Sequence, residues 1–199
     1  MHLTGTGHCQ QTTMFSRRTP EAILLTVPYT GTHFTRTLLE VAGAHPYPQG
    51  KIYVPHAHWL DANVAADWAK IVQTKVLITA RDPYLSAIRC IKTGQENPID
   101  FIADAWDVFF TGMNEMEYFV FDIGLSKEAR LGYARNALNF VSTDLYLDRI
   151  DDYINRWEPM NESVTEHKTE YLKTGKLPEN YDWDKLDNAV EWYNSLTTH

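Results

Sequence analysis

The sequence predicts an α/β fold in which a mainly parallel sheet of four or five strands is flanked by helices on both faces, in three layers. Short apolar runs, too brief for helices, alternate along the chain with longer stretches whose apolar residues recur at helical spacing. The runs are continuously apolar, which is typical of parallel strands that are buried on both faces. With 199 residues, 44% of them hydrophobic, we expect one domain over residues 21–199 behind a polar arm at 1–20.

The first predicted strand is Ile23–Val27, and a turn through Pro28–Thr32 follows it directly. Phe34, Leu38 and Val41 then lie at i, i+4 and i+7, so a helix is expected to begin where the turn ends. A strand, a glycine-bearing turn and a helix in this order form an anion site, because the free N–H groups of the first helical turn and the positive end of the helix dipole point to one place. An ordinary strand-to-helix turn is the alternative interpretation.

The second predicted strand, Lys51–Pro55, carries His56 and His58 at its carboxyl end. Ligands of open α/β sheets bind outside the carboxyl ends of the strands, so both imidazoles are expected on the same edge as the glycine turn. Imidazole is a suitable general base near neutral pH, and His58 is the first candidate, with His56 second. Two structural histidines are an alternative, as is a His-x-His zinc site, which finds no companion ligands in the sequence.

A helix is expected from Asp61, which can cap its N-terminus, to Val72. Its predicted apolar face consists of Val64, Ala65, Trp68, Ala69, Ile71 and Val72. The third predicted strand, Lys75–Ala80, runs into the corner Arg81–Pro83. The remaining predicted elements are a helix at 99–110, a strand at 117–122, a helix after the cap Ser126 to 141, weaker helical patterns at 144–157 and 183–196, and a basic loop at 168–176.

Composition and charge exclude several classes of function. The net charge of −8 argues against a nucleic-acid binder, which would carry a basic face, so an anionic ligand needs a local basic site. Cys9 and Cys90 form neither a disulfide framework nor a C-x-x-C metal motif, and no metal is expected. Neither an 18-residue apolar run nor a signal peptide is visible, so we expect a cytoplasmic protein without a membrane span.

The glycine turn resembles the 5'-phosphosulfate loop of the sulfotransferases that use 3'-phosphoadenosine 5'-phosphosulfate (PAPS), whose pattern is P-K-S-G-T-T. The matching positions are Pro28, Gly31 and Thr32, with Thr30 in place of the serine, His33 in place of the last threonine and Tyr29 in place of the lysine. The turn is not a Walker A motif, which requires a second glycine and a lysine. In the family, the lysine neutralises the charge that develops on the sulfuryl group and its leaving oxygen.

The same family carries R-[DN]-P at the end of its third strand, and Arg81–Pro83 is similar to it in residue type, order and context. There the arginine and a serine eight residues later hold the 3'-phosphate of the cofactor. Position 89 is an arginine in this chain, and Ser86 lies one helical turn earlier, so Ser86 with Arg89 is expected to remake the phosphate site. Pairing of Arg81 with an aspartate that ties strand to helix is the alternative.

The resemblance covers residues 22–141 and implies a P-loop-like sulfotransferase fold. It implies transfer of a sulfuryl group from PAPS to a hydroxyl or amine of a small-molecule or glycan acceptor. Residues 30–33 would hold the phosphosulfate, and His58 or His56 would take the acceptor proton. The family also has a basic loop near its C-terminus that closes over the cofactor, and Lys173 and Lys176 are the corresponding candidates.

Tyr29 is the main departure from the family pattern, because it brings no charge to the lysine position. Arg36 lies one turn into the helix and, on spacing alone, is too far round to replace the lysine. A catalytically silent nucleotide-binding module on the same fold is therefore an alternative. A P-loop nucleotide or nucleoside kinase is another, disfavoured because no lysine lies between Glu21 and Gly50.

Overall fold

The structure is a computed structural model that describes residues 19–45, 52–58, 62–113, 117–156 and 166–197. Four parallel strands form one sheet in the order β4-β1-β5-β6, and β2 and β3 form a separate parallel pair. The strands are β1 Ala22–Thr26, β2 Ala44–His45, β3 Ile52–Tyr53, β4 His56–His58, β5 Lys75–Ala80 and β6 Tyr118–Asp122. The helices are α1 Thr32–Val41, α2 Ala62–Val72, α3 Pro83–Lys92, α4 Pro98–Gly112, α5 Lys127–Val141, α6 Ile150–Arg156, α7 Glu166–Thr174 and α8 Asp187–Thr197, with short 3₁₀ turns at Leu147–Arg149 and Trp183–Leu186.

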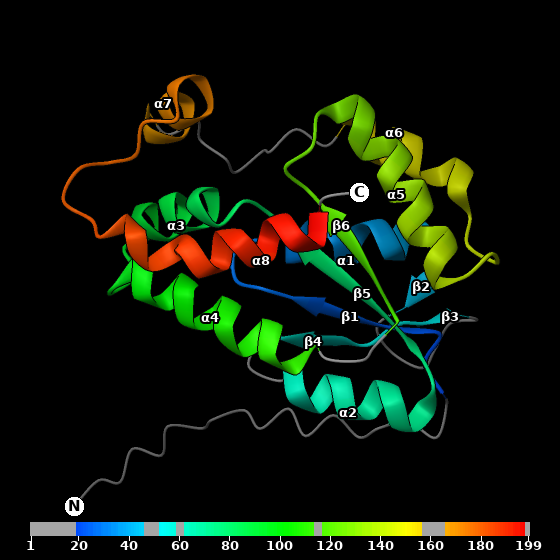
Figure 1. Ribbon diagram of the computed structural model, residues 1–199. Coiled ribbons are helices and arrows are strands. Elements are labelled where there is room, and N and C mark those ends of the chain that lie inside the picture. Colours follow the sequence, from blue (N-terminus) through cyan, green and yellow to red (C-terminus); the bar gives the residue numbers. More distant parts are fainter. Residues whose placement is uncertain (1–18, 46–51, 59–61, 114–116, 157–165, 198–199) are drawn as a thin grey trace, which may run out of the picture.

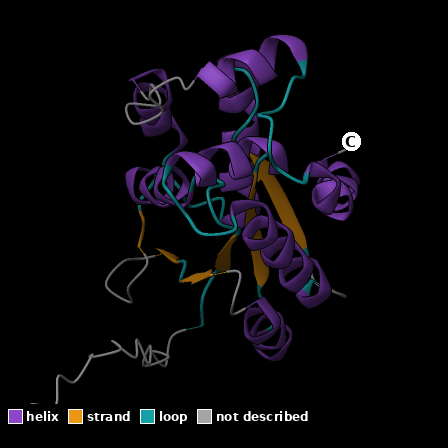
Figure 2. Ribbon diagram, turned by 90° about the vertical axis from the view of Figure 1, so that its left-hand side faces the viewer, coloured by secondary structure: helices purple, strands orange, loops and turns teal. Residues whose placement is uncertain are grey.

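Helices cover both faces of the four-stranded sheet, as the sequence predicts (Figures 1 and 2). Successive residues of β1 alternate between the two faces: Ile23 and Leu25 contribute to one hydrophobic core, and Leu24 to the other. The first core includes Trp106 and Phe109 of α4 and also receives residues of α2, α3 and α8. The second core receives residues of α1, α5 and α6. The continuously apolar strands are therefore buried on both sides, which explains their composition.

The order of the strands creates a switch point between β1 and β5. β1 continues through α1 to β4, whereas β5, on the other side of β1, continues through α3 and α4 to β6. Because α1 and the pair α3–α4 contribute to opposite cores, the chain leaves β1 and β5 toward opposite faces. Open α/β sheets bind ligands at the carboxyl ends of such strands.

The histidine segment differs from its prediction. His56 and His58 lie within β4 rather than after a strand. Of the residues that were expected to form the preceding strand, Ile52 and Tyr53 form β3 of the small sheet. β4 pairs with β1 so that His56 is opposite Leu24 and His58 opposite Thr26. The register still brings His58 level with the last residue of β1, at the carboxyl edge of the sheet.

The buried face of helix α2 overlaps the predicted one only in part, at Ala65, Trp68 and Ala69. Its buried residues are Ala62, Ala65, Ala66 and Ala69, whereas Val64 and Ile71 are 59% and 80% exposed. The small face allows a close approach to α4, because a Cβ added at Gly112 would lie 2.9 Å from the backbone of Ala62. Packing of small residues, which the hydrophobic pattern does not reveal, therefore decided the orientation.

The C-terminal part of the chain holds one clear correction. Residues 168–176, predicted as a basic loop, belong mostly to helix α7, which ends at Thr174. α7 lies beside α3 (Figure 1), and Tyr171 and Tyr84 make an aromatic contact between the two helices. The predicted final helix is confirmed as α8 with the 3₁₀ turn before it. The arm, apart from residues 19–20, and the expected cap Asp61 lie outside the described residues.

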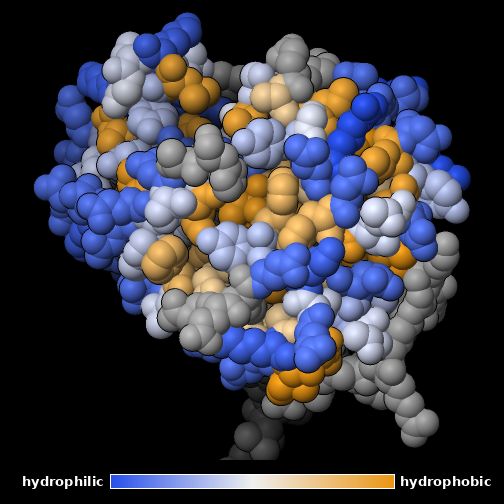
Figure 3. All heavy atoms as spheres, turned by 45° about the vertical axis from the view of Figure 1, so that its right-hand side comes forward, coloured by the Kyte–Doolittle hydropathy of each residue, from blue (hydrophilic) through white to orange (hydrophobic). Residues whose placement is uncertain are grey.

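Hydrophilic residues cover most of the surface in Figure 3, with apolar areas between them. None of the helices in the described ranges is long and apolar enough to cross a membrane.

Candidate functional site

The glycine turn joins β1 to α1 at the switch point. Thr30 is fully buried; its hydroxyl lies 2.8 Å from the carbonyl of Val27, to which it donates, and 3.1 Å from the hydroxyl of Thr79 at the end of β5. Gly31 has a φ of +86° and is the N-cap of α1, which begins at Thr32. A Cβ at Gly31 would meet Cδ1 of Ile123, the end of a side chain that would have to move. The positive φ, which side chains rarely adopt, favours glycine at this position.

The hydrogen bond between Thr30 and Thr79 ties the turn to the neighbouring strand end. β1 and β5 are adjacent, with Thr26 opposite Thr79, so no chain intervenes between the turn and the Arg81–Pro83 corner that follows β5. The N-terminus of α1 adds free N–H groups and a positive dipole end at the same edge. The two sequence signatures therefore lie side by side in the fold.

Tyr29 does not direct its hydroxyl over the turn. Its φ of +61° is unusual for a residue with a side chain, and its hydroxyl lies 3.0 Å from Oγ1 of Thr93, the C-cap of α3. The ring packs against the α3–α4 core. Tyr29 therefore links the turn to α3, and the position that carries the family's lysine brings no charge here.

On the other side of β1, β4 presents its two histidines. Nε2 of His56 is 2.9 Å from Oγ1 of Thr26, and the rings of His56 and His58 are 4.5 Å apart in an edge-to-face arrangement. Burial, and then the nearby His58, Arg36 and His33, lower the pKa of His56 to about 4. His56 is thus neutral at neutral pH, whereas His58 is exposed. His58 is the more accessible base and His56 is held by Thr26.

The Arg81–Pro83 corner is explained locally by the start of α3. Asp82 is the N-cap and accepts a hydrogen bond from the N–H of Tyr84, and Pro83 occupies the first helical position. Ser86 is fully buried and its hydroxyl lies 3.3 Å from the carbonyl of Asp82. The Ser86 hydroxyl thus donates to the N-cap residue of its own helix, just after the end of β5.

Four basic side chains, one from the loop after β5 and three from helices α3, α5 and α7, lie near this corner. Arg81 is only 6% exposed, and this burial lowers the pKa of its guanidinium. The nearby Arg89 also lowers this pKa, whereas Asp82 and Asp122 raise it. Burial lowers the pKa of Lys168 on α7 to about 8, and Arg81, Arg130 and Arg89 add to this effect. We call Arg81, Arg89, Arg130 and Lys168 the basic cluster. Positive charge is thus concentrated at this corner in a protein of net charge −8, with Asp82 and Asp122 as acidic neighbours.

Two aspartates and two tyrosines hold the C-terminal helices to this edge. Tyr171 of α7 donates to Asp82 at 2.8 Å, and Tyr193 of α8 donates to Asp122 at the end of β6. Burial raises the pKa of Asp122, although the hydrogen bonds from Tyr193 and the N–H of Gly124 oppose this. The contact through Tyr171 brings α7, and with it Lys168, over the corner.

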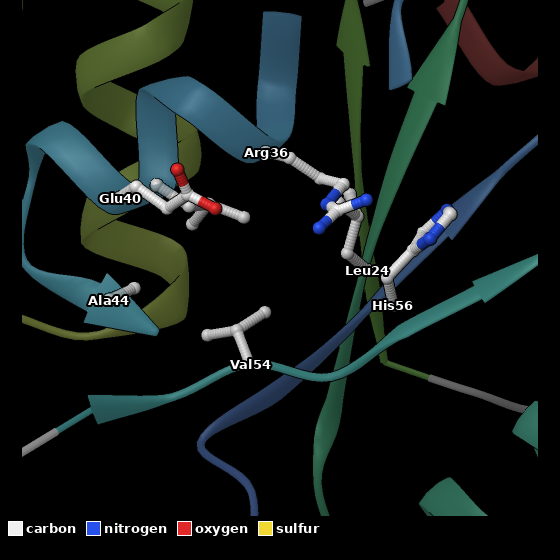
Figure 4. A pocket seen from close by; sticks show the side chains of 7 residues that line it. Leu24, Arg36, Glu40, Ala44, Val54 and His56 are labelled. Carbon is white, nitrogen blue, oxygen red and sulfur yellow. The ribbon is translucent and has the colours of Figure 1, made fainter. Parts of the chain in front are cut away.

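A small pocket lies between α1 and β4, with about 220 Å³ of empty space that includes open solvent (Figure 4). Arg36 and Glu40 of α1 and His56 of β4 are its polar lining residues. Among the described residues, no group of three His, Cys, Asp or Glu side chains is arranged to hold a metal ion.

Comparisons with protein-family models, with curated proteins and with solved structures found no match.

Most of the sequence-predicted site residues gather at the edge formed by β4, β1 and β5. Three residues were missed. Arg130 has no sequence motif, and Lys168 lies in the predicted basic loop without being singled out there, because their position beside Arg81 depends on how α5 and α7 pack. Arg36 was set aside on spacing, yet it lies beside His56. Lys173 and Lys176, the candidates from the resemblance, are exposed.

Proposed function

We propose that this chain is a PAPS-dependent sulfotransferase-like protein that transfers a sulfuryl group to a hydroxyl or amine acceptor. The observation that carries the proposal is the adjacency of the lone-glycine turn and the Arg81–Pro83 corner, linked by Thr30 and Thr79 at 3.1 Å. Two anion sites next to each other on one sheet edge suit a ligand with phosphate groups at both ends of one nucleoside. The 5'-phosphosulfate would occupy the turn, and the 3'-phosphate the basic cluster.

The chemistry follows from this orientation. The bond between sulfur and the oxygen that bridges to the 5'-phosphate breaks, a bond between sulfur and the acceptor oxygen forms, and the acceptor proton passes to the imidazole of His58. The products are a sulfate ester and adenosine 3',5'-bisphosphate. With an amine acceptor, a bond between sulfur and nitrogen forms instead, and the product is a sulfamate. His56, neutral and bonded to Thr26, positions the neighbouring imidazole. The free N–H groups of α1 stabilise the charge on the phosphosulfate oxygens.

Ligand binding tests the proposal directly. Thermal shift or calorimetry should show that the unmodified protein binds adenosine 3',5'-bisphosphate at least about 10-fold more tightly than AMP, or about 1.4 kcal/mol. Arg89→Gln should reduce this preference, because Arg89 is a half-buried member of the basic cluster. Lys70→Gln, an exposed change on α2, is the control and should leave it intact. Equal affinity for the two nucleotides would refute the proposal, and magnesium-dependent ATP turnover would favour a kinase instead.

The orientation of Tyr29 favours one further candidate, a silent binding module on the same fold. Its hydroxyl contacts Thr93, so the turn has no charge from the lysine position. Tyr29→Lys distinguishes the two functions. A gain in sulfuryl transfer would show an otherwise assembled site, whereas absence of transfer by both proteins across a broad acceptor panel would favour the silent module.

A further inference from the structure

Sulfuryl transfer requires positive charge near the bond that breaks, and Tyr29 does not supply it. Removing one such charge-stabilising group commonly reduces the rate by about 10²–10³. Between Glu21 and Gly50 the sequence contains a single lysine or arginine, Arg36. The turn and the helix after it therefore offer one cationic side chain.

Arg36 lies four residues after the first residue of α1, and helical side chains lean toward the N-terminus of their helix. Figure 4 shows its guanidinium extending toward the ring of His56 and away from Glu40. His56 in turn is bonded to Thr26, which ends β1 just before the glycine turn. Arg36 and His56 line one pocket, and His56 is bonded to the last residue of β1, so the guanidinium lies on the β4 side of β1.

The hydrogen bonding of Arg36 also leaves capacity for a ligand. Its Nε is buried and has no hydrogen-bond partner within the part of the chain that the structure describes. Buried donors are rarely left unsatisfied, and a ligand oxygen is one way to satisfy this group. The neighbouring imidazole does not compete for an anion, because the pKa of His56 is lowered to about 4 and the ring is uncharged at neutral pH.

We infer that Arg36 contacts the sulfuryl group of bound PAPS and takes the charge-stabilising role of the lysine that Tyr29 replaces. The inference rests on the proposed function. Arg36 reaches the sulfuryl group from the β4 side, which is also the side of His58, whereas the basic cluster holds the 3'-phosphate on the β5 side. A planar guanidinium donates to two oxygens of one group, so it suits the oxygens of a sulfuryl group or its bridging oxygen.

The test compares two ligands that differ only in the sulfuryl group. Calorimetry gives the affinities of PAPS and of adenosine 3',5'-bisphosphate for the unmodified protein and for Arg36→Gln, Arg36→Lys and Arg156→Gln. Arg36→Gln should weaken the binding of PAPS about 10-fold and the binding of the bisphosphate less than about 2-fold. Arg36→Lys, which keeps the charge, should recover much of the loss. Arg156, exposed and paired with Asp152 on α6, is the control and its change should affect neither ligand.

The outcomes separate this inference from the proposed function. An unchanged affinity for PAPS in Arg36→Gln, or an equal loss for both ligands, overturns the role of Arg36 alone. Failure of the unmodified protein to bind either ligand overturns the proposed function and the inference with it. Thermal unfolding of each variant checks the fold, and Arg36→Met, which removes the charge but keeps an apolar stem of similar length, carries the comparison if the glutamine variant does not fold.

Discussion

His56 should make the stability of this protein depend on pH. Its pKa is about 4 in the folded chain, because of burial and then the neighbouring His58, Arg36 and His33, against an ordinary value of 6.5. Between these values the unfolded chain binds a proton that the folded chain does not, so stability falls as the pH falls. The loss begins near pH 6.5 and is complete near pH 4. At about 1.4 kcal/mol per tenfold change in proton affinity, the full loss is about 3 kcal/mol.

The measurement is denaturant unfolding at pH 7.5 and pH 5, where His56 should account for about 2 kcal/mol of the difference in free energy of unfolding. In His56→Gln, which does not titrate, the difference between the two pH values should be smaller by this amount. The control is His167→Gln, an exposed histidine on α7. An unchanged pH dependence in His56→Gln would refute the reasoning, as would a pKa near 6.5 for His56 measured by NMR in the folded protein.

Two further predictions concern the turn and the basic cluster. Gly31→Ala should destabilise the fold by about 1–3 kcal/mol, because of the positive φ and the approach to Ile123. The control is Gly132→Ala, which has open space in α5 and should be neutral or stabilising. Equal changes in the melting temperatures of the two variants would contradict this prediction. Lys168→Gln should weaken the binding of adenosine 3',5'-bisphosphate, measured by calorimetry, about 10-fold, and Lys70→Gln should leave it unchanged. Equal effects of the two lysine changes would show that α7 does not contribute to ligand binding.

The glycine turn and the Arg81–Pro83 corner were predictable because their geometry is local. A short apolar run followed by Gly31 and an amphipathic helix defines β1, the turn and α1 within about twenty residues. Asp82 and Pro83 also act locally, as the N-cap and the first residue of α3. The four-stranded parallel sheet with helices on both faces follows from the alternation of such units, and the structure confirms it.

The sequence by itself thus determined strands β1, β5 and β6, most helices and two polar turns at strand ends. Only the tertiary structure decided which strand ends are neighbours, which face of α2 is buried, and where single long side chains lie. Arg81 and Lys168 are 87 positions apart, and their charges influence each other because Tyr171 ties α7 to Asp82. The physical reason is that hydrophobic periodicity reports whether a residue faces the core, whereas the partner of a side chain depends on packing between elements that are distant in the chain.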